Sequence, residues 1–134
     1  VYDTVVHYRG GSVQLHGLVD TGNSLYEPFS DLPVIVCRLD SLAPLLPKGV
    51  PAAIRAGEHL GPDFGNYHFP MRLIPFGNVS GSGIVPAFLP DKVELLGEDG
   101  RFKVENVYVA VTTQPVGGAG YNALLNPDLI SIRI

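Results

Sequence analysis

The residues best suited to chemistry in this chain of 134 residues form the run Leu18-Val19-Asp20-Thr21-Gly22. Two apolar residues end a predicted strand, and a carboxylate follows where the chain turns. Gly22 permits a tight turn that brings a backbone N–H to the carboxylate, and Thr21 can hydrogen-bond across to a partner loop. Two carboxylates that share one proton can activate water and protonate a peptide carbonyl. The pattern therefore predicts that Asp20 is one carboxylate of an aspartic-peptidase pair.

The alternative interpretation of this run is an Asx-type turn that closes a strand, because the same residue types are common in turns. The other seven aspartates lack the apolar context and the following Thr-Gly, so one chain supplies one carboxylate only. A two-fold homodimer brings the same patch of both copies together at its axis. The sequence therefore predicts a homodimer in which two Asp20 side chains form one site.

The composition describes a globular chain without the charge of a nucleic-acid-binding protein. Hydrophobic residues make up 46% of the chain, enough for a core, and the length fits one domain over residues 1–134. Nine Lys and Arg residues against 13 Asp and Glu give a net charge of −4, so we expect no nucleic acid as partner. We also expect neither a signal peptide nor a transmembrane helix in this chain.

Candidate metal ligands are sparse. The four histidines, at positions 7, 16, 59 and 68, have no metal-ligand spacing with one another or with the single cysteine, Cys37. We therefore expect no metal and no other cofactor, and packing or surface roles for the histidines. His16 shares a strand face with Asp20, which leaves open that it approaches the cleft. Cys37 stands in an apolar run and is expected to be buried, not nucleophilic.

The elements that must position Asp20 are predicted to be short strands, because Gly and Pro together supply 28 residues of a largely apolar chain. The predicted strands cover residues 1–8, 13–19, 33–37, 67–76, 84–89, 92–96, 102–112 and 129–134, with the first turn at Gly10-Gly11. A helix capped by Asp40 or Ser41 is predicted to reach Leu46, with a helical turn at 52–59 and a helix over 120–126. The expected fold is mainly β, a small closed barrel with one or two short helices.

The order of these features resembles that of the retropepsins. The resemblance implies an active-site loop of Asp20, Thr21, Gly22 and Asn23, and a flap over Leu73–Ala87 that closes on an extended peptide. The flap residues that would bind substrate are Phe76, Gly77, Asn78, Val79, Ser80, Gly81, Ser82, Gly83 and Ile84. It also implies that the segment from Gly120 to Leu125 is the glycine-led helix near the C-terminus of that fold.

A closer resemblance is to the peptidase domain of the sporulation sigma-factor-processing peptidases. It is carried by Gly17-Leu-Val-Asp-Thr-Gly-Asn-Ser-Leu25, followed by Glu27-Pro28 and Leu32-Pro33-Val34. Further matching blocks are Ile74-Pro75-Phe76, Ala87-Phe-Leu-Pro-Asp91 and Tyr121-Asn-Ala-Leu-Leu-Asn-Pro-Asp-Leu129, so the resemblance covers most of the chain.

This second resemblance implies a membrane-anchored aspartic peptidase of endospore formers. Such a peptidase removes the N-terminal pro-segment of a mother-cell pro-sigma factor when a forespore signalling protein activates it. The family's N-terminal membrane half is absent here, so this chain is expected to be the soluble peptidase portion. The full-length protein is expected at the cytoplasmic face of the membrane, at the sporulation septum.

Two positions depart from the wider retropepsin pattern. Asn23 stands where retropepsins carry Ala, and an amide there is placed to donate to Asp20 and favour its charged form. Tyr121 replaces a basic residue that forms an ion pair in retropepsin dimers, so the dimer is expected to be weaker or differently assembled. The role of residues 40–66 is not indicated by the sequence.

Other motifs in the sequence indicate other functions less well. Gly118-Ala-Gly-Tyr-Asn-Ala123 matches a dinucleotide fingerprint, but too little chain follows for the acidic residue that such a site needs. Ser24 has no base paired with it. The main alternative is a dimerisation or binding module of the same fold without turnover, and a third is a small β-barrel that binds a ligand.

Overall fold

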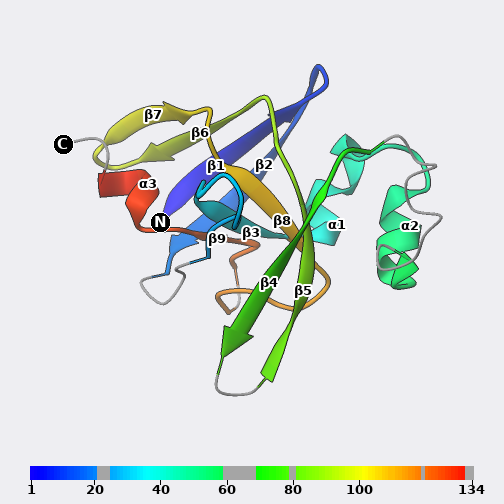
Figure 1. Cartoon of the computed structure of the whole chain (residues 1–134). Coiled ribbons are helices and arrows are strands. Elements are labelled where there is room, and N and C mark those ends of the chain that lie inside the picture. The colour runs from blue at the N-terminus through cyan, green and yellow to red at the C-terminus, as the bar shows by residue number, and fades with distance from the viewer. Residues whose placement is uncertain (21–24, 59–68, 79–80, 119, 132–134) are drawn as a thin grey trace.

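The computed structural model describes residues 1–20, 25–58, 69–78, 81–118 and 120–131. Its strands are β1 (Tyr2–Tyr8), β2 (Gly11–Val19), β3 (Val34–Arg38), β4 (Arg72–Asn78), β5 (Gly81–Phe88), β6 (Lys92–Gly97), β7 (Gly100–Val104), β8 (Tyr108–Thr112) and β9 (Ala123–Leu125). The helices are α1 (Leu39–Leu42), the 3-10 turn η1 (Ala43–Leu45), α2 (Val50–Arg55) and α3 (Asp128–Ser131). Figure 1 shows α2 at the right of the view and α3 at the left, with the β4–β5 hairpin projecting below the sheet.

The nine strands form one sheet in the order β4-β5-β8-β3-β9-β2-β1-β6-β7. The prediction of a mainly β fold is confirmed, but the prediction of a closed barrel is wrong, because the sheet has open ends at β4 and β7. Both end strands carry residues typical of sheet edges: Pro75 in β4 lacks a backbone N–H, and β7 presents the charged Arg101 and Lys103. The described residues also hold three short α-helices and a 3-10 turn, more than the one or two helices predicted.

The first hairpin follows the sequence closely. Tyr8 pairs with Gly11, so the turn residues are Arg9 and Gly10, with φ of 50° and 84°. Two positive φ angles are the requirement of the type I′ turn that joins twisted strands. The turn therefore lies one residue earlier than the predicted Gly10-Gly11, since Gly11 already belongs to β2.

The C-terminal segment contradicts the sequence prediction. Residues 123–125 are the strand β9, not part of a helix, because they lie between β2, to which they run parallel, and β3, to which they run antiparallel. Ala123 and Leu125 are fully buried there, so hydrogen bonds and burial on two sides override the helical preference of Ala-Leu-Leu.

The helix in this region comes later, at α3, where a strand over 129–134 was predicted. Pro127 directly precedes α3, and proline is favourable at the start of a helix. The Asn126 side chain supplies a cap, since its Oδ1 accepts the Asp128 N–H at 2.9 Å. Residues 132–134 of the predicted strand lie outside the described residues.

Three other boundaries differ from the predictions. The predicted strand 102–112 is two strands, β7 and β8, because the chain leaves β6 after Val104 and crosses to the sheet centre, where β8 pairs with β3 and β5. Helix α1 begins at Leu39 with Arg38 at its N-cap and no side-chain cap, so the predicted caps Asp40 and Ser41 lie inside the helix. Strands β4 and β5 together extend further toward their shared turn than predicted, to Asn78 and Gly81.

Gly17 fixes the spacing between β2 and its neighbours on the approach to Asp20. A Cβ at this position would lie 2.6 Å from Thr4 Oγ1 and 3.0 Å from Leu125 Cδ1. Thr4 and Leu125 are both fully buried, so neither side chain has room to move away.

We predict that Gly17→Ala lowers the free energy of unfolding by about 1–3 kcal/mol, the usual cost of overpacking a core. The matched control is Gly10→Asn, because a Cβ at Gly10 meets nothing within 4 Å and Asn adopts positive φ readily. Urea denaturation measures both. Equal stability of the Gly17→Ala and wild-type chains would contradict the close approach.

Candidate active site

Asp20 lies directly after β2 and is fixed to β9 through its backbone. Leu18 and Val19 pair in register with Leu124 and Leu125, and the Asp20 N–H donates to the Leu125 carbonyl at 3.1 Å. Asp20 is half-buried, so its carboxylate is supported by the protein and still reachable from solvent. Thr21, Gly22 and Asn23, the predicted partners of Asp20 in this loop, lie outside the described residues.

The chain re-enters the described region at Leu25, which is held by the same part of the molecule. The Leu25 carbonyl accepts the Val34 N–H at 3.1 Å and the side-chain amide of Asn126 at 3.3 Å. Asn126 is only 1% exposed, and its other amide atom caps α3. Two successive residues, Leu125 and Asn126, therefore hold the chain on both sides of positions 21–24.

Glu27 organises the segment that follows Leu25. Its side chain is 2% exposed and accepts the backbone N–H groups of Phe29 at 3.1 Å and Ser30 at 2.8 Å. Desolvation would raise the pKa of Glu27, but these hydrogen bonds and the charge of Arg72 outweigh it and hold the pKa below its usual value. Sequence reasoning assigned Glu27 no role, because side-chain hydrogen bonds to the backbone of a following turn are typical of Asp and Asn and not of Glu.

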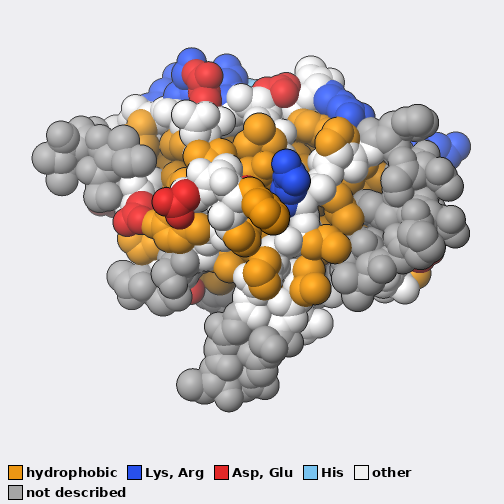
Figure 2. Space-filling model, in the orientation of Figure 1, with side chains coloured by type: hydrophobic (Ala, Val, Ile, Leu, Met, Phe, Trp, Pro, Cys, Tyr) orange, Lys and Arg blue, Asp and Glu red, His pale blue; other side chains and the backbone are white. Residues whose placement is uncertain are grey.

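The predicted flap is a hairpin, as expected. Strands β4 and β5 pair in unbroken register from Arg72↔Ala87 to Asn78↔Gly81. Phe76 and Ile84 are 42% and 50% exposed, and Leu73 on the same hairpin is also exposed. Val79 and Ser80, at the predicted tip, lie outside the described residues. Figure 2 shows further hydrophobic side chains gathered on the face of the molecule above this hairpin.

Phe76 packs against the opposite strand of the hairpin. A Cβ at Gly83, the partner of Phe76, would lie 3.0 Å from the Phe76 ring. The absence of a side chain at Gly83 therefore makes room for the ring.

The base of this hairpin contacts the segment that follows Asp20 in sequence. Leu25 packs against a small buried cluster that contains Val34, Ile74 and Val85, the last two from the hairpin. The Arg72 guanidinium of β4 lies 6.0 Å from the centre of the Phe29 ring. The structure thus brings the base of the hairpin into contact with the segment around Leu25, which follows the predicted active-site loop in sequence.

The other reactive side chains lie apart from Asp20. His16 is four residues earlier in β2 and pairs with Asp3, its Nδ1 lying 3.2 Å from Asp3 Oδ1. Cys37 is fully buried, and burial raises the pKa of its thiol far above the usual value, as expected for an unreactive core residue. Within the described ranges, His, Cys, Asp and Glu form no group of three that suits a metal ion.

In the part of the chain that the structure describes, no helix has the length and apolar character needed to cross a membrane.

Known proteins resemble this chain along nearly all of its length. The family model described as sporulation factor SpoIIGA, a peptidase family, matches residues 1–129. The sporulation sigma-E factor-processing peptidase of Bacillus subtilis is 28% identical over 131 residues, which cover 90% of this chain and 42% of the relative. The corresponding peptidase of Priestia megaterium is 28% identical over 127 residues, or 90% of this chain and 41% of that protein.

A shorter relative matches almost end to end. The putative sporulation sigma factor-processing peptidase of Bacillus thuringiensis subsp. kurstaki is 28% identical over 141 residues, 96% of this chain and 86% of the relative. The chain thus spans about two fifths of the first two relatives and most of the third. No solved structure matches the chain significantly.

We predict that Asn126→Ala lowers the free energy of unfolding by about 1–3 kcal/mol, because the Leu25 carbonyl and the first turn of α3 each lose a hydrogen bond from this buried side chain. The control is Asn106→Ala, at an exposed position between β7 and β8, which we expect to change stability by less than about 0.5 kcal/mol. Thermal or urea unfolding measures both variants. Similar small changes for the two would show that Asn126 does not hold the two segments.

Proposed function

Because the chain belongs to the SpoIIGA family of sporulation factors, we propose that it is an aspartic peptidase domain that processes a sporulation pro-sigma factor. The observation that carries the proposal is the family match over residues 1–129, which contains the one Asp-Thr-Gly run of the chain. Relatives named sporulation sigma-E factor-processing peptidases support a sigma factor as the substrate class. That the cut removes an N-terminal pro-segment is part of the proposal and comes from the resemblance. The chain covers about two fifths of those relatives, so the substrate is part of the proposal.

In the proposed reaction, Asp20 and a second Asp20 share one proton. The charged carboxylate removes a proton from a water molecule, which attacks the peptide carbonyl, and the protonated carboxyl donates to the carbonyl oxygen. The position of Asp20 suits this role, since its backbone is tied to β9 while its side chain is half-buried. Thr21, Gly22 and Asn23 would complete the loop, with the Gly22 N–H directed to the carboxylate.

The second carboxylate comes from a second copy of the chain, in a symmetric homodimer of retropepsin type. A chain with a single Asp-Thr-Gly run has no other source for the pair. In the full-length protein, a membrane-spanning half would hold the domains at the cytoplasmic face of the sporulation septum. Anchoring in a membrane raises the local concentration and so favours a weak dimer, and a forespore signalling protein would act through that half.

The β4–β5 hairpin is the proposed flap, formed by residues 76–84 and their neighbours. Its exposed apolar side chains at Leu73, Phe76 and Ile84 supply surface for an extended peptide. The peptide would lie along the hairpin as an added strand, so that backbone hydrogen bonds hold it and side-chain pockets select it. The base of the hairpin contacts the Leu25 segment, which continues the chain after the Asp20 loop. A movement of the flap would therefore be transmitted to that loop.

We predict that Asp20→Asn reduces cleavage by about a hundredfold to ten-thousandfold, the usual contribution of general acid–base catalysis. The matched control is Asp31→Asn, because Asp31 is exposed and has φ of 59°, a conformation that Asn also adopts. Each chain is co-expressed with the pro-sigma factor of its own host, and shortening of the substrate is followed by gel mobility.

Three outcomes separate the alternatives. Cleavage by wild-type and Asp31→Asn chains but not by Asp20→Asn supports the aspartic mechanism. Cleavage by all three removes Asp20 from the reaction and contradicts the proposal. If no chain cleaves, the same test with the membrane-spanning half fused to this domain decides between a domain that needs activation and a binding module without turnover.

A further inference from the structure

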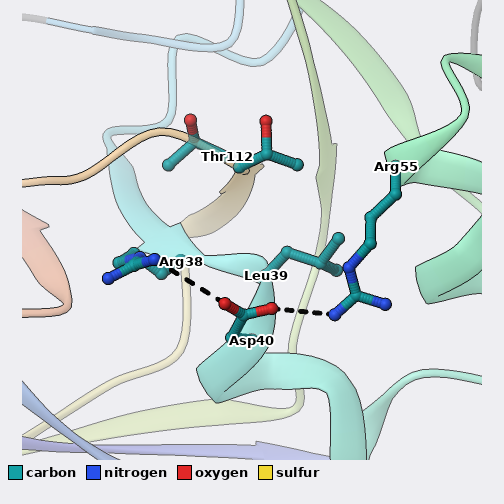
Figure 3. Close-up of a pocket in the computed structure, with 6 residues that line it drawn as sticks. Arg38, Leu39, Asp40, Arg55 and Thr112 are labelled. Atoms are coloured by element: carbon teal, nitrogen blue, oxygen red, sulfur yellow. Dashed lines mark hydrogen bonds and ion pairs between the residues drawn. The ribbon is translucent and has the colours of Figure 1, made fainter.

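A second candidate site lies away from Asp20, where the ends of β3 and β8 meet helices α1 and α2. A pocket of about 250 Å³ opens there, lined by Arg38, Leu39, Asp40, Arg55, Thr112 and Thr113. Figure 3 shows Asp40 between the two arginines, with Thr112 on the other side of the pocket. The lining therefore combines two guanidinium groups, one carboxylate and two hydroxyls.

This pocket is distinct from the proposed cleavage site. The Arg38 N–H donates to the carbonyl of Asn122, whereas the Asp20 N–H donates to that of Leu125. Three residues along an extended chain correspond to about 10 Å. Arg38 and Asp20 therefore flank opposite ends of β9, and a ligand in this pocket would not occupy the Asp20 site.

The arginines have more donor capacity than Asp40 uses. Asp40 contacts Nη2 of Arg55 at 2.8 Å and Nη2 of Arg38 at 3.6 Å, one nitrogen of each. A guanidinium carries five N–H donors in a planar fork that matches a carboxylate. With two positive groups and one negative group, the pocket has a formal charge of +1 and favours a further anion.

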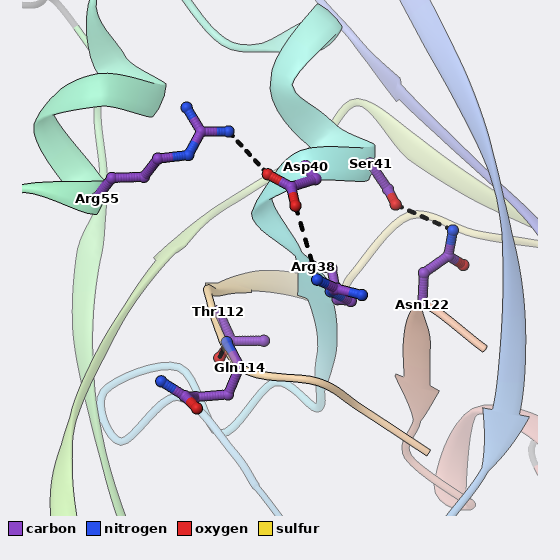
Figure 4. A network of polar contacts seen from close by, with 7 residues as sticks. All are labelled: Arg38, Asp40, Ser41, Arg55, Thr112, Gln114 and Asn122. Atoms are coloured by element: carbon purple, nitrogen blue, oxygen red, sulfur yellow. Dashed lines mark hydrogen bonds and ion pairs between the residues drawn. The ribbon is translucent and has the colours of Figure 1, made fainter. Parts of the chain in front are cut away.

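The polar groups around the arginines are held in place. Asn122, the residue before β9, donates to Ser41 Oγ at 3.0 Å (Figure 4). It also accepts the His16 N–H at 2.7 Å, so it ties α1 to β2. Thr112 Oγ1 accepts the Gln114 N–H at 3.1 Å, so its O–H proton remains to donate elsewhere. Asp40 itself is 66% exposed, so its side chain can turn into solvent without a burial penalty.

We propose that this pocket binds a carboxylate side chain from an acidic protein segment, which displaces Asp40 from between Arg38 and Arg55. Asp40 is an internal place-holder: it occupies the position of the ligand and keeps the two guanidinium groups aligned. The exchange replaces one carboxylate by another, so the ion pairs are conserved. A doubly charged phosphate is disfavoured. The displaced Asp40 remains at the rim of the pocket, so the lining keeps its formal charge of +1, which one carboxylate neutralises and a phosphate exceeds.

Substitution of Asp40 distinguishes a binding site from a purely structural ion pair, because the two predict different changes in ligand affinity. If Asp40 competes with the ligand, Asp40→Asn removes the competitor and tightens binding, whereas Arg38→Gln and Arg55→Gln remove donors and weaken it. A structural pair that only joins α2 to α1 predicts no gain from Asp40→Asn. The binding does not require cleavage, so its failure would leave the proposed function untouched.

The experiment measures fluorescence anisotropy of a labelled peptide with a short run of Glu residues, titrated with the purified chain at low salt. We expect Arg55→Gln to weaken binding by about tenfold or more, the value of losing a charge-assisted hydrogen bond, and Asp40→Asn to strengthen it several-fold. The matched control is Arg101→Gln, an exposed arginine on β7 that pairs loosely with Glu94 at 3.8 Å and loses the same charge. Circular dichroism verifies that each variant is folded.

The proposal requires all of three results: the Glu peptide binds more tightly than a Gln peptide, Asp40→Asn tightens it, and Arg101→Gln changes it by less than about twofold. If Arg101→Gln and Arg55→Gln weaken binding equally, the binding depends only on the overall charge of the chain, and the proposed site is wrong. Inorganic phosphate that binds where the Glu peptide does not would overturn the choice of a carboxylate. If Asp40→Asn does not increase the affinity for the Glu peptide, the ion pairs of Asp40 with Arg38 and Arg55 have a structural role only, and the proposal is wrong.

Discussion

The hydrogen bonds of the three-residue strand β9 hold the end of β2, the Asp20 backbone and β3 in their relative positions. β9 lies between β2 and β3, so it joins the N-terminal hairpin to the half of the sheet that carries β4, β5 and β8. Its last residue, Leu125, accepts the Asp20 N–H, and the next residue, Asn126, binds Leu25 and caps α3. The chain on both sides of positions 21–24 is therefore fixed by two adjacent buried residues, the last residue of β9 and the residue that follows it.

This arrangement places the Asp20 carboxylate at the end of β2. Beside it are the turn that Glu27 holds and the β4–β5 hairpin, each with hydrogen bonds of its own. Glu27 binds the backbone of the following turn through two hydrogen bonds, and its segment meets the base of the β4–β5 hairpin through Leu25 and through Phe29 with Arg72. Groups held by regular elements are positioned more precisely than groups on loops, and the edge of a hairpin can bind an extended peptide as an added strand. Both features suit the proposed role of Asp20. The arginine pocket at the other end of β9 offers a separate surface for acidic protein segments.

The local features that depend on neighbouring residues were predictable from the sequence. The two predicted strands on either side of the Gly-rich turn correspond to the first hairpin, and the apolar run around Ile35 predicted the strand β3. Two apolar runs on either side of a glycine-rich stretch predicted the strands of the β4–β5 hairpin, whereas the expectation of a flap came from the resemblance to the retropepsins. The strand end at Asp20 was identified because apolar residues, a carboxylate and a glycine in sequence have a direct geometric meaning.

The features that depend on distant partners were not predictable. Ala123–Leu125 has the composition of a helix and is a strand because β2 and β3 offer hydrogen bonds on both sides. The barrel was expected to close, but closure depends on a pairing between β4 and β7 that no local pattern encodes. The roles of Asn126 and of the Arg38–Asp40–Arg55 cluster likewise require residues that are far apart in sequence to meet.

The central claim is that one active site needs Asp20 from two chains, and subunit mixing tests it most directly. Wild-type and Asp20→Asn chains are mixed in equal amounts at constant total concentration, allowed to exchange, and assayed for cleavage of the pro-sigma factor. If both carboxylates are required, only wild-type pairs are active, and random pairing leaves about one quarter of the undiluted activity. Retention of about one half would mean that each chain works alone and would contradict the account.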